Sequence, residues 1–290
     1  MRALEITVGV IYIAILCISC PAYARIVYVF ISNPRYRKLE CYQLMIQIGV
    51  VQLLTALSPF DFGLKLIIGT EPLPVVSDIV MKLMTICIKT ETLQSLALAL
   101  NRLKIMCNLK YPKFIHSIIL ATIYVYALAS FGFVMSPLAD IYVPPGEFML
   151  SYNLSLPYTI PFIRVTSITT LVALGTTFFI YVLLIGYLIW LKLENGRIIH
   201  FHQEKKILLY AGVRFIAGSS LILLFHFVSL PRNALIGISI TTSYIVNNLV
   251  LPVLLYMTLY KSLRKEVVTV EIASRSSKTT QVLTQVQSLQ

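Results

Sequence analysis

Two residues of opposite charge stand inside a long apolar stretch. Lys89 and Glu91 both fall within the apolar segment 76–104. A charge at the centre of a bilayer costs at least ~2.5 kcal/mol, so such residues usually line a cavity or meet a partner. Because they are two positions apart, they point to roughly opposite sides of a helix and do not simply pair. We expect them to mark either a site for a ligand or ion, or a structural polar contact between helices.

Arg102 closes the same segment, directly after Asn101. Helical spacing places Arg102 on one stripe with Glu91, which lies about 16 Å deeper. The arginine either extends to water from the mouth of the helix or acts as a charged switch that reaches a neighbouring helix or a docked partner. For Arg25 and Arg214, near the same surface, we expect extension to water.

A proline and two polar residues share one face of the last apolar segment. Asn248, Pro252 and Tyr256 are spaced by four residues. Proline removes a backbone hydrogen bond and kinks the helix, and a neighbouring asparagine can satisfy the freed groups or hold water. The alternative is a static kink. The stretch 260–267 follows and predicts a short amphipathic helix on the inner surface, with Lys261, Arg264 and Lys265 as its basic residues.

The composition tells which elements must position these residues. The chain of 290 residues is 58% hydrophobic and 12% charged, with a mean hydropathy of +0.83. A soluble domain carries about 25% charged residues, so a soluble enzyme, a disordered chain and a collagen are excluded. The length accommodates seven or eight membrane spans. We predict an all-α seven-transmembrane helix bundle, with spans at 6–30, 42–62, 76–104, 114–138, 162–191, 206–229 and 234–259.

The distribution of basic residues predicts the orientation of this bundle. The loops and tail on one side hold 16 Lys and Arg residues, against 4 on the other side. This bias predicts an extracellular N-terminus and a cytoplasmic C-terminus. The single glycosylation sequon, at Asn153, falls in the long loop on the expected outer side, which has no Lys or Arg. Attraction of the basic face to anionic membrane lipids accounts for the net charge of +12 without nucleic acid.

Other functional signatures are absent from the sequence. The one CxxC spacing, Cys17-Ile18-Ser19-Cys20, lies within an apolar segment and no Cys/His array accompanies it, so we predict no metal site. No GxSxG, Walker or HExxH motif predicts an enzyme. The seventh span has no lysine, which excludes a retinal Schiff base at its usual place, and we expect no cofactor. We divide the chain into the seven-helix bundle with its short juxtamembrane helix, 1–265, and a disordered cytoplasmic tail, 266–290.

Three local motifs are distinctive: the third span ends in LALNRL, the seventh contains NNLVLP followed by Tyr256, and YKSLRKEV comes next. Together they resemble the nematode serpentine chemoreceptors, which are divergent seven-transmembrane G-protein-coupled receptors. The resemblance covers about 1–267 and is greatest to the class xa branch. It implies a receptor in the plasma membrane of sensory neurons. A small external chemical would bind among the outer halves of the helices and favour a state that a heterotrimeric G protein recognises.

The resemblance also implies roles for single residues. Arg102 would take the place of the arginine in the rhodopsin-like Asp/Glu-Arg-Tyr motif, with Asn101 in place of the acid. Asn248, Pro252 and Tyr256 would take the place of the Asn-Pro-x-x-Tyr switch, although Tyr256 comes four residues after the proline rather than three. The second outer loop has no cysteine, so the usual disulfide to the third span cannot form. We place the ligand pocket near Lys89 and Glu91.

Two alternatives to a signalling receptor stay open. A multi-span ligand-gated channel or transporter is one; a transporter should show paired repeats or broken helices in corresponding halves, and the sequence reveals neither. An insect-type odorant channel would have the opposite orientation. The other alternative is a receptor-like protein that no longer signals, because Asn101 and the spacing of Tyr256 depart from the usual motifs.

Overall fold

A computed structural model of the chain describes residues 2–71, 73–109, 112–144, 146–195, 201–227 and 233–259, together with Arg264. The predicted tail, 266–290, and the basic residues Lys261 and Lys265 lie outside the described residues.

Within the described part of the chain, seven helical stretches are long and apolar enough to cross a membrane. This confirms the number of spans predicted from the sequence. The helices are α1 (Arg2–Ser32), α2 (Pro34–Arg37), α3 (Glu40–Thr55), α4 (Leu57–Ile68), α5 (Pro74–Met106), α6 (Lys113–Met135), α7 (Thr159–Asn195), α8 (Phe201–Phe227), α9 (Ala234–Ile245), the π-helical turn η1 (Val246–Val250) and α10 (Leu251–Leu259). Two short strands, β1 (Ile141–Tyr142) and β2 (Ser151–Tyr152), pair antiparallel and are the described exception to the all-α prediction.

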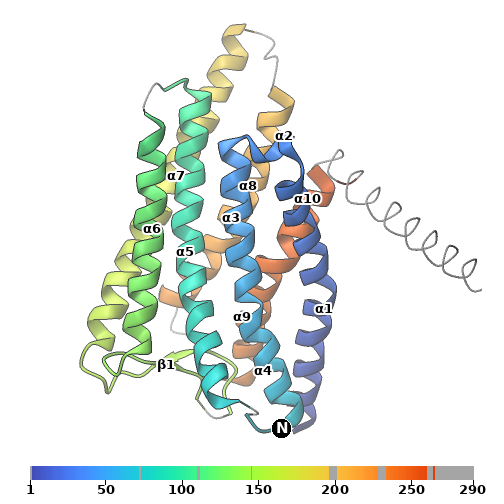
Figure 1. The fold of residues 1–290 in the computed structure, drawn as a ribbon, viewed down its shortest axis with the longest axis vertical. Coiled ribbons are helices and arrows are strands. Elements are labelled where there is room, and N and C mark those ends of the chain that lie inside the picture. The colour runs from blue at the N-terminus through green and yellow to red at the C-terminus, as the bar shows by residue number, and fades with distance from the viewer. Residues whose placement is uncertain are drawn as a thin grey trace, which may run out of the picture.

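The long helices lie side by side along the long axis of the molecule (Figure 1). One end of the bundle carries the N-terminus, the turn after α4 and the segment 136–158 with β1 and β2; we call it the hairpin end. The opposite end carries α2, the end of α5, the start of α6 and the end of α10 (Figure 1). Helix α5 is central, because it contacts α3, α4, α6 and α7.

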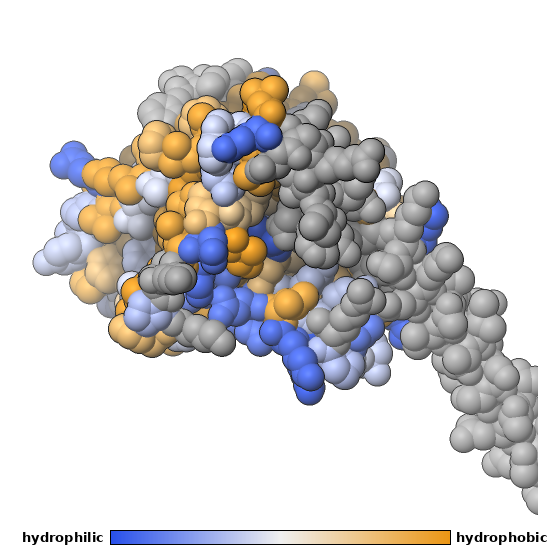
Figure 2. Space-filling view, turned by 90° about the horizontal axis from the view of Figure 1, so that it is seen from above, coloured by the Kyte–Doolittle hydropathy of each residue, from blue (hydrophilic) through white to orange (hydrophobic). Residues whose placement is uncertain are grey.

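The outside of the bundle is apolar, and polar side chains are buried among the apolar residues inside it. Many aliphatic side chains on its flanks are exposed, including Ile18 at 76% and Leu128 at 72%, whereas Gln52 and Asn101 are fully buried. The single tryptophan, Trp190, is 54% exposed on α7. Figure 2 looks onto the opposite end and shows hydrophilic residues set among hydrophobic flanks. Lipid would cover these flanks, while the buried polar groups find partners within the bundle.

The second span differs from the predicted single helix over 42–62. It breaks at Ala56 into α3 and α4, and it extends to Ile68. Pro59 explains the break, because it has no N–H for the carbonyl of Thr55 four residues earlier. At the break the N–H of Ala56 bonds the carbonyl of Leu53 at 3.2 Å, a tighter turn than that of an α-helix.

The last span is also interrupted, by the wide turn η1. The N–H of Leu251 bonds the carbonyl of Val246, five residues earlier. The turn ends two residues before Pro252, which cannot donate to the carbonyls of the preceding turn. The irregularity of the seventh span thus lies beside Pro252, where the sequence predicts a kink, whereas the break at Ala56 in the second span was not predicted.

Close packing fixes α1 against α4 near the hairpin end. A Cβ atom on Gly9 would lie 2.7 Å from the carbonyl oxygen of Gly63, so glycine permits the two backbones to approach. The guanidinium of Arg2 donates to the carbonyls of Leu66 and Ile67, at 3.0 and 2.6 Å. These carbonyls belong to the last turn of α4, where they lack helical donors.

Candidate functional site

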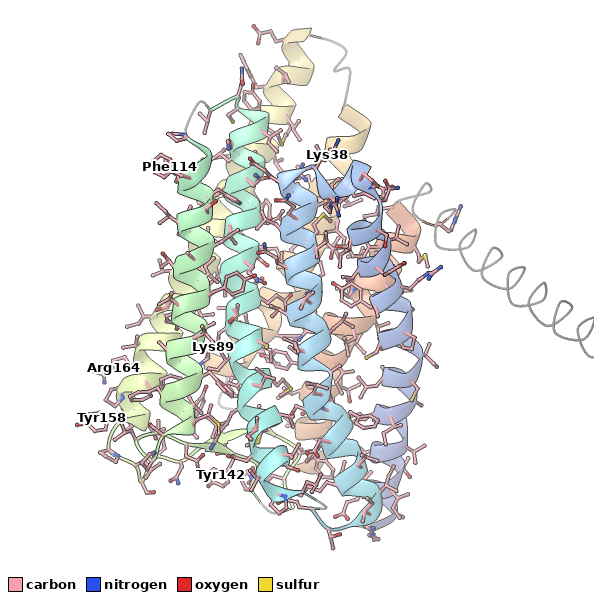
Figure 3. All side chains as sticks on the ribbon, in the orientation of Figure 1. Lys38, Lys89, Phe114, Tyr142, Tyr158 and Arg164 are labelled. Atoms are coloured by element: carbon pink, nitrogen blue, oxygen red, sulfur yellow. The ribbon has the colours of Figure 1, made fainter. Side chains whose placement is uncertain are left out.

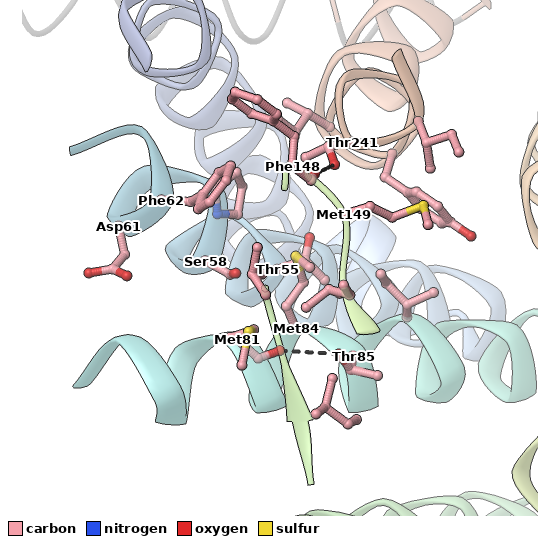
Figure 4. A pocket seen from close by; sticks show the side chains of 18 of the residues that line it. Thr55, Ser58, Asp61, Phe62, Met81, Met84, Thr85, Phe148, Met149 and Thr241 are labelled. Atoms are coloured by element: carbon pink, nitrogen blue, oxygen red, sulfur yellow. Dashed lines mark hydrogen bonds between the residues drawn. The ribbon is translucent and has the colours of Figure 1, made fainter. Parts of the chain in front are cut away.

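A cavity of about 310 Å³ opens among the helices at the hairpin end. Its walls come from α4, α5 and α9, and the segment that contains β1 and β2 crosses it (Figure 4). The lining combines apolar, thioether and hydroxyl side chains, among them Thr55, Met81, Met84, Thr85, Met149 and Thr241. The volume is within the range of small-molecule sites, roughly 300–1,000 Å³.

Polar contacts hold the crossing segment over the cavity. Asp140 forms an ion pair with Lys82 of α5 at 3.0 Å, and Lys82 also binds Asp78 at 2.8 Å. On the other side, the hydroxyl of Thr241 donates to the carbonyl of Phe148 at 2.7 Å (Figure 4). The Lys82–Asp140 ion pair thus connects this loop to α5, the helix to which the usual disulfide would connect it.

Lys89 lies at the cavity, at the middle of α5 (Figure 3). Its ammonium is buried, donates to the hydroxyl of Thr166 at 2.9 Å, and lies 4.8 Å from the ring centre of Phe162 and 5.9 Å from that of Tyr152. Burial raises the pKa of the Tyr152 phenol to about 12, so this ring is neutral near pH 7. Lys89 is therefore held by one hydroxyl and two aromatic faces.

Glu91 faces away from Lys89, as its spacing predicted, and is not part of the cavity lining. It accepts a hydrogen bond from Gln52 of α3 at 2.7 Å and forms a buried ion pair with Arg214 of α8. A smaller space of about 40 Å³ borders both charged residues. The expectation that Arg214 extends to water was wrong, because a carboxylate on the neighbouring helix binds its guanidinium inside the bundle.

The ion pair continues into the interrupted last span. Arg214 donates to the backbone carbonyl of Asn247 and, at 3.1 Å, to its side-chain oxygen. In a π-helical turn the partner of that carbonyl would be residue 252, which is a proline without an N–H. Arg214 thus satisfies an acceptor that the helix cannot. Asn247 in turn donates to Asn248 at 3.1 Å, and Asn248 lines the cavity.

Asn248, Pro252 and Tyr256 share a buried face, in agreement with their spacing. Tyr256 packs on Tyr210, with ring centres 4.6 Å apart, and on Phe30 at 5.3 Å. Sequence reasoning singled out these three residues but missed Gln52, Asn247 and the role of Arg214. The signal for Asn247 was its place in an asparagine pair before a proline.

Arg102 and Asn101 lie inside the bundle near the opposite end. Arg102 is 3% exposed, and its guanidinium interacts electrostatically with the phenol of Tyr181 in α7. Asn101 donates to the carboxylate of Glu40 at 3.1 Å, and Lys104 lies 3.5 Å from the same oxygen. An acid from the first turn of α3 therefore contacts Asn101, the residue that stands in place of the local acid.

The remaining predicted site residues lie at the two ends. The side-chain oxygen of Asn153 accepts from the hydroxyl of Ser155 at 2.6 Å, at the hairpin end with the N-terminus. Arg264 is exposed and follows α10. The N-terminus and the end of α10 are thus on opposite ends, as seven spans require.

Comparison with known structures shows the fold. The chain is similar to squid rhodopsin in its crystal structure, with a TM-score of 0.73 and 10% sequence identity, over 91% of this chain and 84% of that one. No protein-family model and no curated protein sequence matches. At this identity the likeness concerns the fold alone. Together with the seven apolar helices, it shows a multi-pass membrane protein with the rhodopsin-like seven-helix fold.

Proposed function

We propose that this protein is a chemosensory receptor that binds a small external chemical in the cavity and activates a heterotrimeric G protein at the opposite end of the bundle. The rhodopsin-like fold and the ligand-sized cavity support this function. The resemblance of LALNRL and NNLVLP to the nematode serpentine chemoreceptors, class xa branch, supports the chemosensory role. The same resemblance supports a location in the plasma membrane of sensory neurons, with the N-terminus outside.

The observation that carries the proposal is the buried chain of contacts beneath the cavity. Asn248 lines the cavity and binds Asn247, Asn247 binds Arg214, and Arg214 binds Glu91 of α5. Every link is a hydrogen bond or ion pair between packed elements, which is the kind of contiguous network through which sites couple. A ligand that moves Asn248 would change the ion pair between Arg214 of α8 and Glu91 of α5.

The proposed mechanism places the partner surface at the opposite end. Release of Arg214 from Glu91 would let the opposite ends of α5 and α8 separate and uncover Arg102. Asn101, Arg102, Lys261, Arg264 and Lys265 would then contact the G protein. The ligand need only bind the released state more tightly than the closed one to shift this equilibrium.

The test is nucleotide exchange by purified Gα subunits of each class in the presence of the receptor in lipid nanodiscs. Glu91→Gln removes the charge of the ion pair but keeps a hydrogen-bonding oxygen, so we expect ligand-free exchange to rise several-fold. Arg102→Ala in the same background should return exchange to the level without receptor. Arg164→Ala, which removes an exposed cation at the hairpin end, is the matched control.

Nucleotide exchange could stay at the level without receptor for both the wild type and Glu91→Gln, with every Gα class. That result would contradict G-protein coupling and favour a receptor-like protein that no longer signals.

A channel or transporter is the second candidate, favoured by the breaks at Ala56 and at η1. Ion or solute flux into proteoliposomes, without any G protein, would establish that function instead.

A further inference from the structure

Lys89 brings a positive charge to the cavity that no described carboxylate balances. Its side chain is buried, and among the described residues no Asp or Glu oxygen lies within ion-pair distance of its ammonium. Glu91, the acid nearest in sequence, binds Arg214 instead. A buried cation without a counter-charge is costly, and it favours a site that an anion completes.

The carboxylates that do line the cavity interact with other lysines. Glu71 pairs with Lys65, and Asp61 acts on the same lysine from one helical turn away. Asp78 pairs with Lys82. Asp78 precedes Lys89 by eleven residues, which places it about 16 Å away along α5. These acids therefore form the rim at the hairpin end and leave the charge of Lys89 unbalanced.

The immediate neighbours of Lys89 do not supply a negative charge either. The phenol of Tyr152 is neutral near pH 7, and burial raises its pKa further, to about 12. The hydroxyl of Thr166 donates its own proton to the carbonyl of Phe162 at 2.9 Å and can only accept from Lys89. An ammonium has three N–H donors, and the contacts of the described residues use one of them.

We propose that the cavity binds a small organic monocarboxylate, with its carboxylate on Lys89 and its apolar body against the methionine-rich wall. This inference rests on the proposed function, since it names the chemical class of the ligand. One cation matches one negative charge, and the apolar lining disfavours a phosphate or a dicarboxylate. A volume of about 310 Å³ lies at the lower end of the range of small-molecule sites, so the ligand is small.

The experiment compares octanoate with octanamide, a neutral molecule of the same size. Binding to the purified receptor in nanodiscs is measured by saturation-transfer NMR, with empty nanodiscs subtracted. We expect octanoate to bind the wild type and to lose about 10- to 100-fold in affinity in Lys89→Met, because a charge-assisted hydrogen bond is removed. Octanamide should bind weakly and equally to both. Arg164→Met removes a cation that points outward at the same end and should leave octanoate binding unchanged (Figure 3).

Several results would overturn the ligand class. They are equal binding of octanoate and octanamide to the wild type, unchanged octanoate binding in Lys89→Met, or no binding by any monocarboxylate of six to ten carbons. If Lys89→Met does not fold, Lys89→Arg keeps the charge and should keep the preference for octanoate over octanamide, and its loss would count against the proposal. The assay contains no G protein. Octanoate binding through Lys89 without nucleotide exchange would refute only the proposed function, and exchange driven only by neutral compounds would refute only the ligand class.

Discussion

At the scale of single residues, the Glu91–Arg214 ion pair is buried between α5 and α8. Arg214→Met leaves Glu91 with Gln52 but without its counter-charge. Removing one partner of a buried ion pair typically costs about 3–5 kcal/mol, so we expect a large fall in the apparent melting temperature of the protein in nanodiscs.

A double variant separates the charge from the packing. Glu91→Met with Arg214→Met removes both charges and should recover most of the stability that Arg214→Met alone loses, because no unpaired charge remains. A double variant less stable than the sum of the two single variants would contradict this account of the pair.

At the scale of helices, the crossing of α1 and α4 depends on Gly9. A Cβ at this position meets the Gly63 carbonyl at 2.7 Å, whereas a Cβ on Gly132 of α6 meets no atom within 4 Å. Alanine is favoured over glycine in a helix by about 1 kcal/mol. We therefore expect Gly132→Ala to raise the melting temperature slightly. Gly9→Ala should lower it, because overpacking costs about 1–3 kcal/mol of folding free energy. Similar shifts in the two variants would show that α1 and α4 can separate without cost.

The loop over the cavity depends on the ion pair between Lys82 and Asp140. Asp140→Asn keeps the side-chain oxygen that accepts from the N–H of Ile141 at 2.9 Å but removes the charge. We expect amide hydrogen exchange over 136–158 to become about two- to fivefold faster, since a partly exposed ion pair contributes up to ~1 kcal/mol. High salt should have the same effect on the wild type and little effect on the variant. Unchanged exchange rates in both tests would show that the loop is held by its other contacts.

At the scale of the whole molecule, the predicted orientation concerns the side on which each end lies. In intact cells we expect a glycan on Asn153 that is lost in Asn153→Gln and Ser155→Ala and kept in Ser155→Thr. A tag after the last residue should bind antibody only after permeabilisation. A tag that is accessible on intact cells, with no glycan, would invert the bundle, and the channel would then be the leading function.

The sequence predicted the seven spans and the opposite directions of Lys89 and Glu91 because both follow from properties of a single helix. Apolar length sets a span, and a spacing of two separates side chains by about 200°. The partner of Arg214 could not be predicted in this way. It depends on which helix packs against α8 and at what depth, and these are tertiary facts. The break at Ala56 was missed for a related reason, since Pro59 in an apolar run is compatible with a kink as well as with a break.

The fluorescence of Trp190 can report on the protein without an added label. It is the one tryptophan in the chain, it is exposed on α7 toward the opposite end, and its ring lies 5.7 Å from that of Tyr187. The intrinsic tryptophan emission of the protein therefore comes from a single place, on the exposed flank of the bundle and away from the cavity. Quenchers carried on lipid tails at known depths would locate this place in the bilayer, and a protein that covers the opposite end would shift the emission without any label.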